Sequence, residues 1–170
     1  MRKSITIMMV VAGALVLAAC GGDSSTSDAD TGAAIPGAGD AEGTIAVSVG
    51  ESGSDSMYLR LSQETAAAGS VTFVVTNEGQ KEHEFIVMQT DTPAGDFAIV
   101  PEDESMSEEM GHQHDFDEDA PGITVVDEVA DLAAGATEEL TVTLDPGHYA
   151  LVCNIKPHYQ QGMWADFEVT

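Results

Sequence analysis

Apolar and polar residues alternate in short runs over most of the chain from position 44 onward. Leu140, Val142 and Leu144 share one face of such a run, and Thr141 and Thr143 share the other, as expected for a half-buried β-strand. Similar segments, rich in β-branched and aromatic residues, are 44–49, 57–61, 71–77, 83–89, 123–129, 138–145, 148–155 and 163–170. Turn sequences such as Asn-Glu-Gly and Asp-Pro-Gly separate them. The pattern predicts an all-β domain, an antiparallel sandwich or barrel.

Residues 101–122 interrupt this pattern with the sequence PEDESMSEEMGHQHDFDEDAPG. We expect an acidic, irregular insert there, with at most one short helical turn. The insert contains Met106, Met110, His112 and His114. Histidines in an acidic loop are ordinarily solvated; the alternative is a secondary copper or zinc site built from these four residues.

The first 20 residues have the features of an export signal. Arg2 and Lys3 precede an apolar run that is too short for a membrane span, and Leu17-Ala18-Ala19-Cys20 resembles a bacterial lipobox. This resemblance implies a lipid on Cys20 that anchors an extracytoplasmic protein to the cell membrane; an ordinary secretory signal cut elsewhere is the alternative. Residues 21–43 are small, polar and acidic, which predicts a disordered tether. One domain then spans 44–170.

The charge of the chain limits its partners. Five basic and 30 acidic residues give a net charge of −25, and removal of the signal leaves three basic residues and a charge of −27. A chain with so few cations cannot neutralise phosphates, so nucleic acid is disfavoured as a partner. The acidic surface either keeps the protein soluble or steers it toward a basic partner protein.

The two cysteines have different roles in this interpretation. If Cys20 carries a lipid, Cys153 has no disulfide partner in the chain. A leftover cysteine in an exported protein is a free reactive thiol, an intermolecular bridge or a metal ligand. The sequence CNIKPHYQQGM at 153–163 favours a metal ligand, because a cysteine, a histidine and a methionine recur there at regular intervals.

The two-residue period of a strand indicates where the candidate ligands point. Cys153 is in phase with Tyr149 and Leu151, Met163 with Phe167 and Val169, and His83 with Phe85 and Val87, so all three face the core. His158 lies in the loop between Cys153 and Met163 and follows Pro157, so we expect a partly exposed ligand. Two other side chains, His148 and Trp164, are out of phase and should face outward.

A thiolate, two imidazoles and a thioether form a distinctive ligand set. It suits a trigonal copper site with a weak axial methionine, which serves both Cu(I) and Cu(II). Zinc more usually takes further thiolates, histidines or carboxylates. The alternative is that Met163 and Cys153 are ordinary core residues.

The segments NEGQKEHEFIV (77–87) and DPGHYALVCNIKPHYQQGMWADFEV (145–169) resemble the cupredoxins, the blue copper proteins related to plastocyanin, azurin, auracyanin and sulfocyanin. The resemblance implies a Greek-key β-sandwich, one type 1 copper and single-electron transfer, with His83, Cys153, His158 and Met163 as ligands. In several cupredoxins Asn or Ser next to the upstream histidine braces the ligand loop, whereas Glu82 and Glu84 flank His83 here.

The favoured function is therefore electron transport rather than catalysis. We expect a monomer that exchanges electrons with redox proteins, such as a cytochrome or a membrane oxidase or reductase with a basic docking face. The alternative is extracytoplasmic copper storage or delivery through the methionine- and histidine-containing insert. A copper enzyme is disfavoured, because multicopper oxidases and nitrite reductases need more histidines than the five present, and a binuclear purple copper site needs two cysteines.

Overall fold

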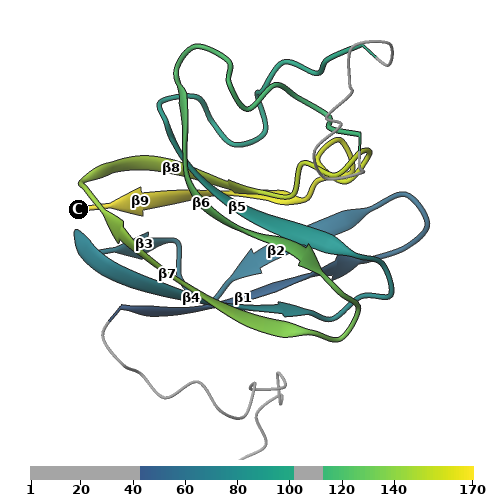
Figure 1. Ribbon diagram of the computed structural model, residues 1–170, viewed down its shortest axis with the longest axis horizontal. Helices are drawn as coiled ribbons and strands as arrows, with labels where there is room; N and C mark the ends of the chain where they lie inside the picture. Colours follow the sequence, from purple (N-terminus) through teal and green to yellow (C-terminus); the bar gives the residue numbers. More distant parts are fainter. Residues whose placement is uncertain (1–42, 102–112) are drawn as a thin grey trace, which may run out of the picture. The chain divides into compact units, whose positions relative to one another are not determined.

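The computed structural model describes residues 43–101 and 113–170, which form two β-sheets packed face to face (Figure 1). Sheet A has the order β2-β1-β4-β7, and sheet B has the order β3-β9-β8-β5-β6. The strands of sheet A are β1 (Thr44–Glu51), β2 (Met57–Leu61), β4 (Gly69–Asn77) and β7 (Thr137–Leu144). Those of sheet B are β3 (Thr65–Ala66), β5 (His83–Thr90), β6 (Ile123–Leu132), β8 (Gly147–Val152) and β9 (Trp164–Val169). The all-β prediction is confirmed.

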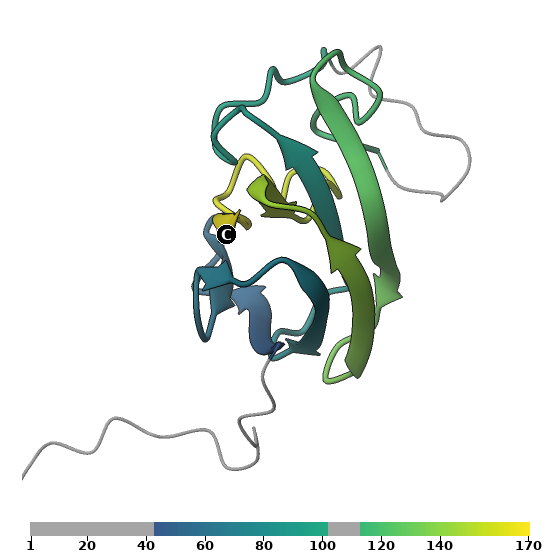
Figure 2. The same ribbon diagram turned by 90° about the vertical axis from the view of Figure 1, so that its left-hand side faces the viewer.

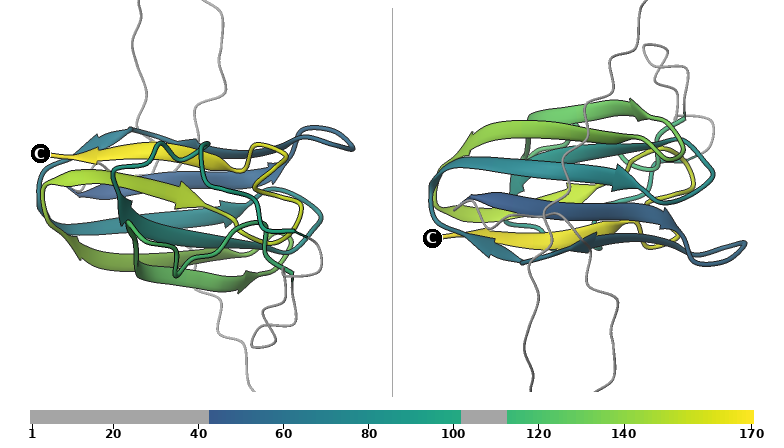
Figure 3. Two further views of the ribbon diagram at one scale, coloured as in Figure 1. Left: turned by 90° about the horizontal axis from the view of Figure 1, so that it is seen from above. Right: turned by 90° about the horizontal axis from the view of Figure 1, so that it is seen from below.

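The pairing of the strands differs from a purely antiparallel sandwich. Strands β1 and β4 pair in parallel, as do β3 and β9, while the other pairs are antiparallel. A parallel neighbour requires a crossover connection, which the chain makes by passing through β2 and then β3 before it returns as β4. Strand β3 has two residues and was not expected. Seen from below, β1, β4 and β7 lie side by side (Figure 3).

The main core lies between the inner faces of the two sheets. Phe73 of β4 is fully buried, and its ring centroid lies 5.2 Å from that of Phe85 and 5.6 Å from that of Phe167. These rings pack against one another between the two sheets. The residues that alternate inward along each strand therefore form the inner surface of the sandwich. Cys153 and Met163 belong to the same core.

A second, smaller core covers the outer face of sheet B. The described parts of the segment between β5 and β6, 91–101 and 113–122, cross over this face (Figures 2 and 3). From this segment Phe97 and Phe116 pack against Tyr159, and the cluster also includes Ile86 and Met88 of β5. Strand β5 is therefore buried on both faces. The apolar residues of the segment thus cover the outer side of β5.

The expected insert lies within this segment, and its described part is 101 and 113–122. These residues form turns and isolated bridges, with no helical turn among them. Ile99 bridges to Phe116, and His114 bridges to Ile155. Residues 102–112 are outside the described range. Among the described residues, no helix has the length and apolar character needed to cross a membrane.

Candidate metal centre

The residues of the CNIKPHYQQGM motif form the loop between β8 and β9, called the ligand loop below (153–163). Cys153 directly follows β8, and Met163 directly precedes β9. The Cys153 amide donates to the Met163 carbonyl at 3.0 Å, and the Met163 amide donates to the His158 carbonyl at 3.1 Å. These bonds close the loop on itself and fix three of the four candidate ligands relative to one another.

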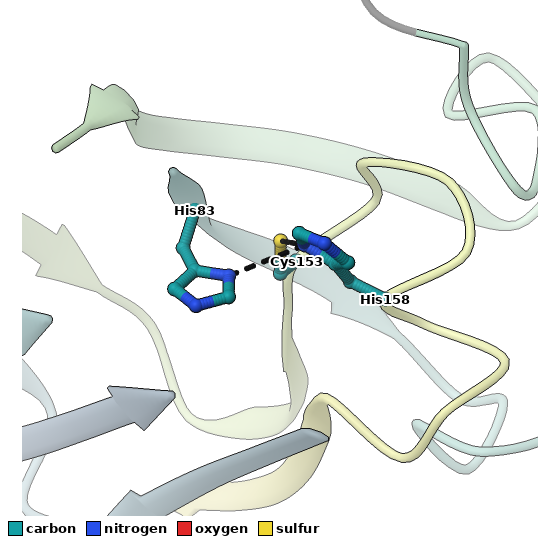
Figure 4. A group of neighbouring side chains, drawn as sticks. All are labelled: His83, Cys153 and His158. Carbon is teal, nitrogen blue, oxygen red and sulfur yellow. Dashed lines mark hydrogen bonds between the residues drawn. The ribbon is translucent and has the colours of Figure 1, made fainter. Parts of the chain in front are cut away.

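Three side-chain donor atoms converge at the mouth of this loop (Figure 4). The Nδ1 atoms of His83 and His158 lie 3.2 Å apart, and the Cys153 sulfur lies 3.5 Å from His158 Nδ1. The potential ligand atoms of all three residues fall within 4.8 Å of one another. His83 opens β5, so the site joins the start of one strand to a loop about 70 residues later in the chain.

Burial distinguishes this group from a surface cluster. His83, Cys153 and Met163 are fully buried, and His158 is only 5% exposed. The core-facing orientations expected for His83, Cys153 and Met163 are confirmed. The expectation of a partly exposed His158 was wrong, because its ring packs against His83 and Cys153, while Tyr159 beside it is buried in the second core.

The surroundings of the Cys153 sulfur oppose an uncompensated thiolate. Burial raises the pKa of the Cys153 thiol far above its usual range, and the nearby Glu84 carboxylate adds to this shift. A thiolate can form in this environment only if a positive charge compensates for its lost hydration. Two imidazole nitrogens aimed at the same point provide neutral donors for such a cation. The donor set, soft sulfur with two imidazoles, fits copper.

Outer contacts orient the His83 ring. Its Nε2 atom, on the side away from the ligand group, lies 3.5 Å from Glu51 Oε1, although this contact does not have hydrogen-bond geometry. The Glu51 carboxylate accepts hydrogen bonds from the amides of Gln80 and Lys81, both at 2.9 Å. Burial would raise the pKa of Glu51, but these two bonds lower it. A charged Glu51 favours a proton on Nε2, which leaves Nδ1 free to bind a metal. Burial also lowers the pKa of His83 itself.

Glu84, the residue after His83, contacts the ligand loop beside Cys153. It is 5% exposed, and its Oε1 atom accepts the Asn154 amide at 2.5 Å, next to Cys153. Its own amide lies 3.5 Å from the Cys153 sulfur and donates to it. Burial raises the Glu84 pKa to about 7, and the Asn154 amide opposes that rise. The carboxylate thus links β5 to the ligand loop next to Cys153, and its burial opposes the charged form.

The structure places the remaining candidates away from the ligand group. His148 has a side chain 24% exposed on β8, and Trp164 is 37% exposed, so both point outward as expected. His114 lies 3.6 Å from Glu118 Oε1 through its Nδ1 atom. Met106, Met110, His112 and the predicted lipidation site Cys20 lie outside the described residues.

Sequence reasoning missed the residues that support the ligand loop from outside it. Asp115 and Asn154 are fully buried polar residues, and both contact the loop or belong to it. Strand β5 carries the one available signal, since its run Phe85-Ile86-Val87-Met88 does not alternate. A continuous apolar run indicates a strand covered on both faces, and therefore a segment that packs over the outer side of sheet B.

A family model, the Sulfocyanin (SoxE) domain, matches residues 44–170. The chain belongs to the sulfocyanin family. Sulfocyanins are cupredoxins, so the cofactor of this protein is a single copper ion, and His83, Cys153 and His158 form a group that could hold a metal ion. Cupredoxins generally carry electrons, and their members are extracytoplasmic.

Several solved structures resemble the fold. Auracyanin from Roseiflexus castenholzii is 19% identical, with 74% of this chain and 96% of that chain covered and a TM-score of 0.47. Rusticyanin from Thiobacillus ferrooxidans is 16% identical, with 76% and 79% covered and a TM-score of 0.49. An azurin from Methylomonas sp. strain J is 13% identical, with 76% and 99% covered and a TM-score of 0.48. Among curated proteins, none matches the chain. The family assignment rests on the family model alone.

Proposed function

We propose that this sulfocyanin carries single electrons between extracytoplasmic redox proteins, with copper bound by His83, Cys153, His158 and Met163. The observation that carries the proposal is the convergence of the Cys153 sulfur and two histidine Nδ1 atoms within 4.8 Å in a buried site. When bound there, copper supplies a one-electron couple between Cu(I) and Cu(II).

The protein's own contribution is to hold the donors still. His83 is placed by its strand, with the Glu51 carboxylate beside its Nε2 atom, and Cys153 accepts a bond from the amide of Glu84. His158 is fixed through its amide, which donates to the Ile155 carbonyl at 2.6 Å. Ligands held by strands and by such contacts change position little between oxidation states, so the reorganisation cost of electron transfer is low. A buried thiolate also retains copper firmly, which suits a carrier better than a delivery protein.

The absorption spectrum of the purified protein with Cu(II) tests the centre. A thiolate-to-copper charge-transfer band in the visible region is expected, and Cys153→Ser should abolish it because the folded domain has no other thiol. Stepwise reduction should bleach the band with one electron per copper and leave the metal bound. A colourless protein, or one that prefers zinc to copper, would contradict the proposal.

Rapid mixing with a basic redox protein tests the carrier role. Electron transfer should slow as salt rises, because ions screen the acidic surface from its partner. Loss of copper to an acceptor protein during turnover would instead favour copper delivery. Rates that do not change with salt would exclude the proposed electrostatic steering while leaving the electron-carrier role in place.

The proposed lipid anchor on Cys20 calls for a separate measurement. Native protein should partition with membranes, whereas Cys20→Ala should release or mislocalise it without changing the copper spectrum of the folded domain. Native protein found wholly in the soluble fraction would exclude the anchor.

A further inference from the structure

Asp115 lies outside the ligand loop yet bonds to it at two separated points. It is fully buried and belongs to the segment between β5 and β6. Its amide donates to Asn154 Oδ1 at 3.0 Å and to the Asn154 carbonyl at 3.1 Å. Its carboxylate accepts from the Gln160 amide at 3.1 Å and from Gln160 Nε2 at 2.6 Å. Asn154 directly follows Cys153, and Gln160 is two residues beyond His158.

Other contacts also link the segment between β5 and β6 to the ligand loop. Asn154 Oδ1 also accepts the Phe116 amide at 3.1 Å, and Asn154 Nδ2 donates to the Phe116 carbonyl at 3.0 Å. On the other side of His158, the Tyr159 hydroxyl accepts the Phe97 amide at 2.9 Å, and the ring packs on Phe97 and Phe116. His158 is therefore held between two anchored stretches of the ligand loop.

Asp115 is itself secured against movement. Its carbonyl accepts the Val100 amide at 2.9 Å, while Phe116 beside it is 2% exposed within the second core. A carboxylate with several N–H donors forms strong, directional bonds, and a fully buried one needs such partners to offset its lost hydration. The cost of burying Asp115 is met by bonds to the ligand loop.

We propose that Asp115 is a positioning residue for the copper centre, which sets the separation of Cys153 and His158 by bonding to Asn154 and Gln160. This proposal rests on the proposed function, since it concerns copper held by these ligands. It assigns a role to the segment between β5 and β6: the second core fixes Asp115, and Asp115 fixes the loop.

Asp115→Ala tests the proposal, with Asp117→Asn as the control. Asp117 is exposed in the same segment, and its Oδ1 atom accepts the nearby Asp119 amide, so its variant loses a charge without losing a bond to the loop. In Asp115→Ala, copper release to a chelator should accelerate about 10- to 100-fold, the usual effect of removing a support behind metal ligands. The charge-transfer band should shift or broaden, while the control matches wild type.

A rescue variant distinguishes positioning from a general structural role. In Asp115→Asn the new amide faces the Gln160 N–H groups, so one of the two bonds is lost. The double variant Asp115→Asn, Gln160→Glu restores it with reversed polarity and unchanged net charge, because the amide nitrogen introduced at position 115 can donate to the carboxylate introduced at position 160. The double variant should return the band and the copper release rate toward wild type. Failure to rescue both would contradict the proposal.

Hydrogen exchange of the copper-free protein supplies a readout independent of the metal. In Asp115→Ala the amides of the ligand loop should exchange faster, about 10-fold or more, while those of β4 stay protected. Equal acceleration throughout the domain, or no change in the loop, would overturn the proposal. If wild type shows no band with copper, the proposed function and this assignment both fail. A wild-type band that Asp115→Ala leaves unchanged overturns this assignment alone.

Discussion

The Nδ1 atoms of His83 and His158 face each other across 3.2 Å, although 75 positions separate the two residues in the chain. His83 is placed by the start of a central strand, and His158 by a loop bound at both ends. The tertiary fold brings two imidazole nitrogens to one point beside a buried thiol.

Single substitutions of the ligands should separate strong donors from a weak one. His83→Ala or His158→Ala should remove the charge-transfer band, because either change removes a strongly binding imidazole donor that water would replace only poorly. Met163→Leu should keep the band and change the redox potential, since a thioether would bind copper weakly. Titration with Cu(II), followed by absorption and by voltammetry, checks this. A full band in His83→Ala would exclude His83 as a ligand.

The aromatic cluster between the sheets should dominate stability. Phe73→Ala should lower the free energy of unfolding by about 3–5 kcal/mol, because it leaves a cavity between Phe85 and Phe167. Val125→Ala, on β6 with its residue 38% exposed, should change it by less than about 0.5 kcal/mol. Urea unfolding of the copper-free protein measures both. Similar losses in the two variants would contradict the assigned core.

Trp164 should report on the segment that covers sheet B. A Cβ atom on Gly95 would lie 2.6 Å from Trp164 Cζ2, so Gly95→Ala must displace the indole. Trp164 is the only tryptophan of the chain, and its fluorescence emission should therefore shift in this variant. Ala98→Ser, at an exposed position of the same segment, should leave the emission unchanged. An unshifted spectrum in Gly95→Ala would mean that the ring does not rest on this glycine.

His148 should make stability depend on pH. Its Nδ1 lies 2.7 Å from the Thr90 carbonyl and its Nε2 lies 2.9 Å from Asp166 Oδ1, so both ring nitrogens face acceptors. Partial burial alone would lower the pKa of His148, but these two bonds, with the charges of Asp166 and Glu168, raise it above its usual value. The stabilisation is then complete below the unfolded pKa, about 6.5, and is lost as pH rises through the folded pKa.

The variant His148→Gln isolates this effect from the many other carboxylates. Its free energy of unfolding should fall below that of wild type by about 1 kcal/mol at low pH, the scale of a partly exposed charged pair. The difference should shrink as pH rises. Denaturant unfolding of both proteins at about pH 5.5 and 8.5, on either side of the ordinary histidine pKa, measures it. A difference that stays constant or grows with pH would show that His148 is not charged in the folded protein.

The sequence by itself determined every strand except the two-residue β3, and the inward orientation of three candidate ligands. Strict alternation, as at Leu140, Val142 and Leu144, fixes which face of a strand is buried, because side chains project to opposite sides with a period of two residues. The same local rule predicted that His83, Cys153 and Met163 face inward. The spacing of cysteine, histidine and methionine indicated a metal site. None of these features depends on which strands become neighbours.

Only the tertiary structure decided the parallel pairing of β1 with β4, the burial of His158 and the support of the ligand loop. Alternation does not specify the direction of a neighbouring strand, since parallel and antiparallel partners bury the same face. The burial of His158 depends on its ring packing against His83 and Cys153. Asp115 and Gln160 are polar residues at irregular positions 45 apart. No local period links them, so their contact exists only because the second core places one segment over the other.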